Sequence, residues 1–546
     1  MRSKQWLGVA KALRTGRGLG HAIFHWAPRT SGTFCSLPED VLVCILSFCD
    51  LRDLMCCMLV CRLLRDVVRT DGCLLQYKTL LAANGMVDGP LDHLGKLQML
   101  QQYVALSGSG TYVNTHSRYC SPIDARNNDW TVSLSFSSCN SYIITKRQEA
   151  VTEVYAPPEF PGRRSMRHWT IPLDTFPGET NRAVAVDPAQ DLLLVFQRET
   201  FSEWDVAVNI RSLHDAFVPH PNAALPILHT APSLLMLSHL SAIQIHRHHV
   251  AWMQLSRDTG LDSQIEIWDW QAGRMIWRHQ FGVEVSFALL DAAHIVVTSN
   301  NWKDLRVFRF DPPSDPSVDV LRLNLPLEHI SHRIQESSIP HPPPNAPFWP
   351  DPELRMIVVV YVEAQTSKRA VLLIPYATFR KFLYSRPLLQ VLTTLQRRVN
   401  WKDWERDALR LSLSVPTDAW NVYQYHSFGS RFSLLMSNWS KFPRSSTIVT
   451  FDLNPWAEKY ARSAHSAADM PHLKGCLGSG WKRMFHHSEH EGSSSIPYAI
   501  HHSFREDHEG GEGGGFTVVS TDPFGHTEVF NRLPGQKGVG FVSYTA

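Results

Sequence analysis

Cysteine thiols are the reactive groups that this sequence concentrates most strongly. Seven of the ten cysteines lie between Cys35 and Cys73, and thiols at this density could bind zinc, form disulfides or supply a nucleophile. No Cys-x-x-Cys pair is present, and neighbours such as Cys56 and Cys57 point to different faces of an apolar helical segment. We therefore expect free, buried thiols that act as small apolar side chains in a reducing compartment.

Histidines gather in a later segment, where they could in principle bind a metal. They are His486, His487, His490, His501, His502 and His508. A metal site needs converging ligands and a dry surrounding shell, whereas this segment is rich in Ser, Gly and Glu and is typical of a solvated loop. A second group, His246, His248 and His249, is expected at a strand edge or in a loop. We expect no metal site.

The motifs that organise common active sites are absent. The sequence has no Gly-x-Ser-x-Gly, no His-Glu-x-x-His and no Gly-x-x-x-x-Gly-Lys-Ser/Thr. The glycine run near Gly513 does not join a strand to a helix, so it is not a dinucleotide cradle. We expect neither a catalytic residue nor a cofactor.

Composition bounds the class of protein. The 546 residues are 44% hydrophobic and 19% charged, with a net charge of +2, which is typical of a folded multidomain protein without a strong overall field. The longest apolar runs, such as "RMIVVVYV" from Arg355, have the length of a strand. The 17 tryptophans and 26 phenylalanines lack an accompanying basic patch, so we assign them to packing. We expect no nucleic-acid or membrane partner.

Residues 1–34 form a basic leader with no acidic side chain. The sequence is typical of two alternatives: a disordered segment or a short amphipathic mitochondrial presequence. Without a presequence, the expected location is cytoplasmic or nuclear.

Two helices are predicted directly after the leader. Ser36 and Glu39 have capping-box spacing, with Pro38 in the first turn. Asp50 is predicted to cap a second helix that continues to a stop at Gly72. A third helical stretch is predicted over 91–106, with leucines on one face.

After residue 107 the pattern changes to short strands joined by Pro, Gly, Asn and Asp. Seven stretches read as hairpins; they begin at Thr131, Asp191, His249, His294, Arg355, Arg431 and Gly515. A recurring hairpin predicts a β-propeller-like domain of about seven blades. The segment "IEIWDWQAGRMIW" from Ile265 resembles the end of a WD-repeat blade. A β-sandwich or another all-β array is the alternative.

Three connections interrupt this series. The segment "PHPPPNAPFWPDP" from Pro340 is predicted to be a stiff loop, and "EGGEGGGF" from Glu509 a flexible one. Near Asn400, "NWKDWERDALRL" predicts a short helix or turn.

The segment from Cys35 to about Leu81 resembles an F-box. The resemblance rests on "LPEDVLVCILSFCDLRDL", "VCRLLRDV" and "LLQYKTLLAANG". Leu64 stands where the family usually has Trp, which keeps an apolar anchor of smaller area. The longer arrangement, with a β-rich remainder, is similar to fungal F-box proteins that have propeller-like C-terminal domains. The adaptor-binding residues that the resemblance implies are Leu37, Pro38, Leu42, Ile45, Leu46, Leu51, Leu54, Val60, Cys61 and Leu64.

The resemblance implies a non-catalytic substrate adaptor of an SCF-type ubiquitin ligase. The F-box would bind a Skp-type adaptor and, through it, a cullin, while the β domain would bind an unknown target protein. The physical reasoning agrees, because two short apolar helices have more apolar surface than they can cover. Ile45→Asp or Leu42→Asp is therefore expected to abolish adaptor capture.

The implied organisation is multidomain α plus all-β. It has a leader at 1–34, an F-box at 35–82, a helical spacer at 83–106 and the propeller-like domain at 107–546. Two alternatives remain. One is a propeller enzyme or small-ligand binder that the helices merely support, and the other is an F-box scaffold outside a ligase.

Overall fold

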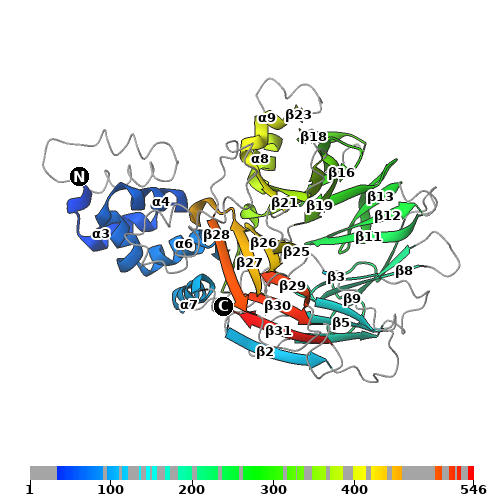
Figure 1. The fold of residues 1–546 in the computed structure, drawn as a ribbon, viewed down its shortest axis with the longest axis horizontal. Coiled ribbons are helices and arrows are strands. Elements are labelled where there is room, and N and C mark those ends of the chain that lie inside the picture. The colour runs from blue at the N-terminus through cyan, green and yellow to red at the C-terminus, as the bar shows by residue number, and fades with distance from the viewer. Residues whose placement is uncertain are drawn as a thin grey trace.

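The computed structural model shows a helical unit beside a larger β domain (Figure 1). The leader, most of the proline-rich loop, the Glu509 glycine loop, and His486, His487, His490 and His508 lie outside the described residues. The described residues are 34–89, 95–109, 113–120, 135–136, 143–147, 151–156, 167–172, 183–198, 206–230, 237–256, 262–311, 317–326, 329–336, 347–363, 369–384, 397–413, 420–438, 445–457, 499–506, 516–522, 525–530 and 539–545.

The helical unit, residues 34–83, begins with a 3-10 turn at Phe34–Ser36. Its helices are α3 (Glu39–Ser47), α4 (Leu51–Val60), α5 (Arg62–Asp66), a π-helical turn (Val67–Asp71) and α6 (Cys73–Ala83). Pro38, rather than Ser36, is the N-cap of α3, because its extended backbone precedes the first helical turn. The carboxylate of Asp50 caps α4 as predicted, accepting a hydrogen bond from the Asp53 amide at 2.8 Å.

The single helix predicted after Asp50 is instead two. Cys61 has an extended backbone, with φ −154° and ψ 165°, so the helical hydrogen bonding of α4 stops at Val60. The next helix restarts at Arg62, and its first turn is closed by the bond from the Arg65 amide to the Cys61 carbonyl. The break changes the direction in which Val60 and its neighbours point.

The spacer after the helical unit is partly a strand. Strand β1 (Met86–Asp88) pairs antiparallel with β20 (Phe348–Pro350), which lies in the predicted proline-rich loop. Helix α7 (Lys96–Ser109) follows, starting later than the predicted residue 91. The spacer is therefore attached to the β domain through β1.

In the part of the chain that the structure describes, the β domain contains seven sheets, numbered here I to VII in chain order, and all their strand pairs are antiparallel except one in sheet IV. Sheet I contains β3 (Ser135–Phe136), β4 (Ile143–Arg147), β5 (Val151–Ala156) and β6 (Arg167–Pro172). Sheet II contains β7 (Ala183–Asp187), β8 (Leu192–Arg198), β9 (Val206–Ser212) and β10 (Ile227–His229). Sheet III contains β11 (Leu237–His246), β12 (His249–Ser256), β13 (Ser263–Asp269) and β14 (Arg274–Phe281).

Sheet IV contains β15 (Val285–Leu289), β16 (His294–Ser299), β17 (Asp304–Arg309) and β18 (Asp319–Asn324), with β23 (Arg397–Val399) as a fifth strand parallel to β18. Sheet V contains β19 (His329–Glu336), β21 (Met356–Glu363), β22 (Arg369–Pro375) and β24 (Leu409–Ser412). Sheet VI contains β25 (Trp420–Phe428), β26 (Arg431–Asn438), β27 (Ser445–Asp452) and β28 (Ala499–Glu506).

Sheet VII joins the two ends of the β domain. Its strands β29 (Phe516–Asp522), β30 (Gly525–Phe530) and β31 (Val539–Thr545) come from the end of the chain, and its outer strand is β2 (Val113–Cys120). The first strands of neighbouring sheets contact one another, as with β7 and β11, β15 and β19, and β25 and β29. This radial order, with apolar side chains packed between consecutive sheets, is that of a propeller-like domain.

All seven predicted hairpins are confirmed, each in a different sheet. Near Asn400 the predicted short helix is α9 (Trp401–Trp404), which follows α8 (Tyr376–Tyr384) in the insertion of sheet V. The prediction of a loop for His501 and His502 is wrong, because both lie on β28, paired with Thr450 and Val449 of β27.

Candidate adaptor-docking surface

The helical unit has an apolar core of its own. Leu42, Leu46, Leu54 and Leu64 are at most 4% exposed and pack with Met58 and neighbouring side chains. These four were among the ten predicted adaptor contacts, but the chain itself covers them. They are core residues that hold the helices in place, and their contact with an adaptor stays a prediction.

The same unit also exposes an unusual amount of apolar surface. Among the described residues, thirteen large hydrophobic side chains are exposed, and six of these lie within residues 34–77. The most exposed are Phe48 at 73% and Val60 at 72%. The others are Phe34, Leu59, Leu63 and Leu74. So many exposed side chains in so short a segment are typical of a protein-binding surface.

Helix α3 shows how this surface arises, because it carries two apolar stripes. Leu42, Leu46 and Cys49 follow helical spacing and are buried. The residues just before each of them, Val41, Ile45 and Phe48, are rotated by about 100° around the axis and are half-buried or exposed. One stripe serves the core, and the other remains open.

The other predicted adaptor contacts lie on or next to this open surface. Leu37, Ile45, Leu51 and Cys61 are half-buried, while Pro38 and Val60 are exposed. Sequence reasoning missed Phe34, Phe48, Leu59, Leu63 and Leu74. The available signal was that apolar residues occupy more than one face of these helices.

At all six described positions the cysteines of the helical unit form no disulfide, as predicted, although only Cys49 is buried. Burial raises the pKa of Cys49 to about 11 and that of Cys57 to about 12, with nearby Asp53 adding to both shifts. Cys44, Cys56 and Cys73 are exposed, so the prediction of burial is wrong for these three. The described residues hold no cluster of side chains that could bind a metal.

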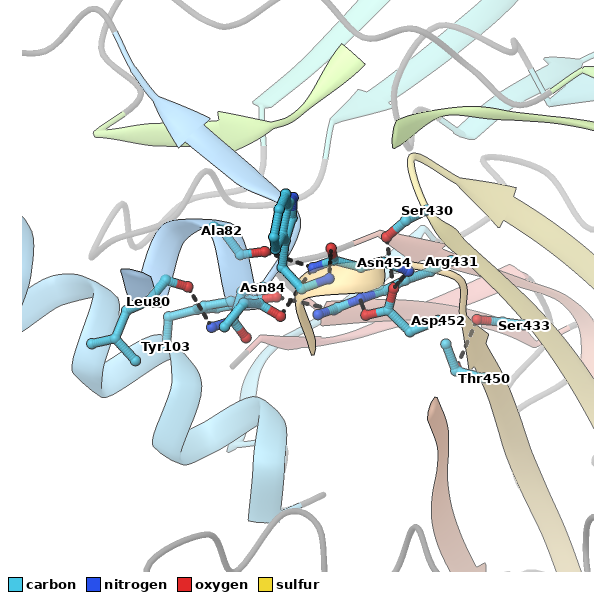
Figure 2. Close-up of polar contacts among 12 residues, drawn as sticks. Leu80, Ala82, Asn84, Tyr103, Ser430, Arg431, Ser433, Thr450, Asp452 and Asn454 are labelled. Atoms are coloured by element: carbon cyan, nitrogen blue, oxygen red, sulfur yellow. Dashed lines mark hydrogen bonds and ion pairs between the residues drawn. The ribbon is translucent and has the colours of Figure 1, made fainter. Parts of the chain in front are cut away.

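Buried polar contacts fasten the helical unit to sheet VI (Figure 2). The side chain of Asn454, which is 1% exposed, donates hydrogen bonds to the carbonyls of Ala82 at 2.6 Å and Ala83 at 3.0 Å. These carbonyls belong to the last turn of α6, where the helix leaves acceptors unpaired. Asn454 therefore works as a C-terminal cap supplied by a distant part of the chain.

A second polar link involves α7. The Arg431 guanidinium donates to the Tyr103 hydroxyl at 3.1 Å and to the Asp452 carboxylate at 3.2 Å. Burial lowers the pKa of Arg431, but Tyr103 and Asp452 outweigh it and raise the pKa on balance. The Asp452 carboxylate also accepts hydrogen bonds from the Ser430 hydroxyl and the backbone N–H of Asn454, so the two polar links form one continuous network.

Apolar contacts reinforce the same junction. Trp456, just beyond β27, packs against the core of the helical unit. Tyr103 and Phe348 join Leu80, Leu81 and Leu100 in a separate buried cluster. The open apolar surface is thus held in a defined orientation relative to the β domain.

A family comparison identifies the helical unit. The F-box-like family model matches residues 34–77. The chain carries an F-box-like domain. The matched residues include the core leucines and the open apolar surface described above, and they end within α6.

The β domain is similar to solved propeller domains. The WD40 domain of SCAP from fission yeast aligns with 7% identity and a TM-score of 0.36, over 79% of this chain and 98% of that chain. The β-propeller domain of the Trilobed protease from Pyrococcus furiosus aligns with 8% identity and a TM-score of 0.29, over 58% and 92%. An acylaminoacyl peptidase from Pyrococcus horikoshii aligns with 8% identity and a TM-score of 0.27, over 56% and 48%.

Among curated proteins, none matches this chain. Within the described residues, no helix is long and apolar enough to span a membrane.

Proposed function

We propose that this protein is the substrate-recognition subunit of an SCF-type ubiquitin ligase. The observation that carries the proposal is the open apolar surface on the F-box-like helices, with Phe48 and Val60 almost three-quarters exposed. A Skp-type adaptor covering this surface would remove apolar area from water, which is the main driving force for such association.

The exposed and half-buried side chains of the helical unit define which residues could contact the adaptor. Of the predicted residues, Leu37, Pro38, Ile45, Leu51, Val60 and Cys61 retain surface. Phe34, Phe48, Leu59, Leu63 and Leu74 extend it. Val60 and Leu63, on either side of the break at Cys61, are candidates for the centre of the interface.

The mechanism is proximity and needs no catalytic side chain from this chain. The adaptor would bring a cullin and the ubiquitin-charged enzyme, and the β domain would hold a target protein. Because Asn454, Arg431 and Trp456 fasten the F-box-like domain to sheet VI, the target would stand at a fixed distance from the enzyme. A fixed geometry raises the effective concentration of a target lysine.

The test is co-expression of the full chain with a Skp-type adaptor, followed by affinity purification. Val60→Asp and Ile45→Asp should reduce recovery of the adaptor strongly, since a charge would be desolvated at the interface. Their thermal unfolding should stay close to that of the parent, because both side chains keep access to water. Leu42→Asp should destabilise the helical unit and also abolish recovery of the adaptor, because Leu42 is 1% exposed in the core.

The matched control is Val318→Asp, an exposed valine on the β domain. Adaptor recovery at the parent level from Val60→Asp would contradict the proposal. Adding a cullin to the purified pair separates the two F-box functions, since an adaptor complex without cullin would indicate a scaffold outside a ligase. The proposal also places the protein in the cytoplasm or nucleus, which fractionation of cells expressing the full chain would test.

A further inference from the structure

The F-box-like domain is attached to one end of the β domain. Contacts within the β domain show which strand connections lie at that end. In a meander of four antiparallel strands, the connection between strands one and two and that between strands three and four lie at the same end. The attachments of the helices and the spacer use such connections, namely Arg431 directly after the β25–β26 connection, Asn454 after β27, and β20 between β19 and β21. We call this end the F-box face.

Contacts between neighbouring sheets show that the F-box face continues to sheets II, III and IV. The Gln190 side chain, after β7, donates to the Arg247 carbonyl, after β11, at 3.0 Å. The ring of His249, at the start of β12, meets Phe310, at the end of β17, edge to face. Between sheets IV and V, the Arg355 guanidinium donates to the Leu290 carbonyl.

Every exposed large hydrophobic side chain that the structure describes in the β domain lies at this face. Phe217, Val218 and Leu225 are between β9 and β10, and Met275 is the second residue of β14. Val318 precedes β18, and Tyr384 ends α8. These six exposed side chains favour protein binding on the F-box face.

Leu225, between β9 and β10, lies against the turn that leads into β14, two residues before Met275, at the outer seam between sheets II and III. Leu225 packs on Gly273, where an added Cβ would lie 2.8 Å from the Leu225 Cγ. The Ala224 amide donates to the Gln271 carbonyl at 2.9 Å, which fixes the two connections together. Leu225 is 46% and Met275 38% exposed, so the seam has a small apolar surface open to water.

Positive charge accompanies this apolar seam. Arg274 and Arg278 of β14 are both exposed, and neither makes an ion pair within the described part of the chain. Charge complementarity therefore favours a partner with carboxylates beside its apolar side chains.

The edge of β14 offers a way to bind. Strand β14 is the outer strand of sheet III, and no described strand pairs with its outer edge. At the equivalent edge of sheet IV, this chain adds β23 beside β18, with Leu321 opposite Arg397 and Leu323 opposite Val399. The molecule thus already contains an extended segment added to an outer strand.

We propose that β14 binds an extended, acidic and apolar segment of the target protein as an additional strand. This inference rests on the proposed function and deepens it by naming the chemistry of the target. The register of β13 and β14 puts Met275 and Arg278 on one face of β14 and Arg274 on the other. The apolar side chains of the segment would cover Leu225 and Met275. One of its carboxylates would pair with Arg274 on the other face, and another, further along the strand, would pair with Arg278.

The test uses the full chain and fluorescent peptides of about twelve residues, a length that spans one strand with flanks. One peptide has leucine or valine together with glutamate on both faces of the strand that it would form, and its partner has lysine in place of glutamate. The glutamate peptide should bind, and the double variant Arg274→Glu with Arg278→Glu should weaken its binding about tenfold. The same variant should gain binding of the lysine peptide. Amide exchange in β14 should slow when the glutamate peptide is bound.

Lys303→Glu, a charge reversal on the β16–β17 turn at the opposite end, is the matched control. Equal binding of the two peptides by the parent, or unchanged binding by the double variant, would overturn the proposal. Adaptor recovery is measured on the same samples. The double variant should retain the adaptor, and Val60→Asp should retain the peptide, so failure of either proposal is seen separately.

Discussion

At the scale of single residues, the cysteines of the F-box-like domain differ in what surrounds their sulfur atoms. Burial raises the pKa of Cys49 to about 11 and that of Cys57 to about 12, from an ordinary value of 9.0. The thiolate is the reactive form. These two thiols therefore stay protonated at neutral pH, and Cys49 is also buried while Cys57 is half-buried.

We predict that iodoacetamide at pH 8 modifies Cys44, Cys56 and Cys73 in the folded protein and leaves Cys49 and Cys57 unmodified. The direction of the pKa shift also predicts that Cys49 contributes stability below pH 9, which is lost as the pH rises through about 11. Peptide mass spectrometry after timed labelling measures the first expectation. In urea-unfolded protein all five thiols should react at similar rates. Modification of Cys49 or Cys57 in the folded protein would contradict the prediction.

The exposure of single residues also shows which feature of the site the sequence could not predict. The sequence analysis predicted both Leu42 and Val60 as adaptor contacts, because both are apolar and both match the F-box pattern. In the structure, Leu42 is 1% exposed and Val60 is 72% exposed. Both belong to helices with apolar residues on two faces, so periodicity alone cannot tell the core stripe from the open one. For Val60 the local backbone matters as well, because the extended conformation of Cys61 ends α4 at this residue.

At the scale of elements, the junction of α6 with sheet VI is the contact whose loss should be easiest to observe. Asn454 donates two hydrogen bonds to the end of α6 and accepts a third from the Trp456 amide. Asn454→Asp keeps the shape but replaces both donated bonds by repulsion between a carboxylate and two carbonyls. The expected loss of stability is about 1–3 kcal/mol, as for other unsatisfied buried groups.

We predict that Asn454→Asp speeds amide exchange in α6 and β1 while β8 and β12, in sheets II and III far from the junction, exchange at the parent rate. Hydrogen exchange with mass spectrometry measures each element separately. The matched control is Asn301→Asp, which changes an exposed asparagine on the opposite end of the β domain. If the two variants gave the same exchange pattern, the polar junction would not hold the F-box-like domain.

The elements themselves were largely predictable because their patterns are local. The hairpin from His249 consists of an apolar strand, a polar turn and a second strand, as predicted. In "IEIWDWQAGRMIW" the turn falls at Gly273, which has a positive φ of 66°. Strand β1 was not predictable. Its three residues carry no strand pattern, and its partner Phe348–Pro350 lies in a proline-rich stretch, so only the assembled fold reveals the pair.

At the scale of the whole molecule, the contacts that fix the architecture join residues far apart in sequence. The bond from Asn454 to Ala82 spans 372 residues. The pairing of β2 with β31 brings together the strand after the spacer and the last strand of the chain. No local pattern encodes such pairs, which is why the sequence predicted the number of hairpins but neither the closing strand nor the docking of the helices.

We predict that β2 and β31 can be cross-linked only in the register of the structure. Ser117 lies opposite Val542, whereas Phe541 lies opposite Arg118. Because successive strand residues point to opposite faces, Ser117→Cys with Val542→Cys should form a disulfide under mild oxidation, and Ser117→Cys with Phe541→Cys should not. Peptide mapping without reduction measures both. The bond should raise resistance to unfolding, since it closes a very long loop. Equal cross-linking of the two pairs would mean that the ends of the β domain are not joined in this register, and the F-box-like domain would then lack the fixed platform on which its proposed role depends.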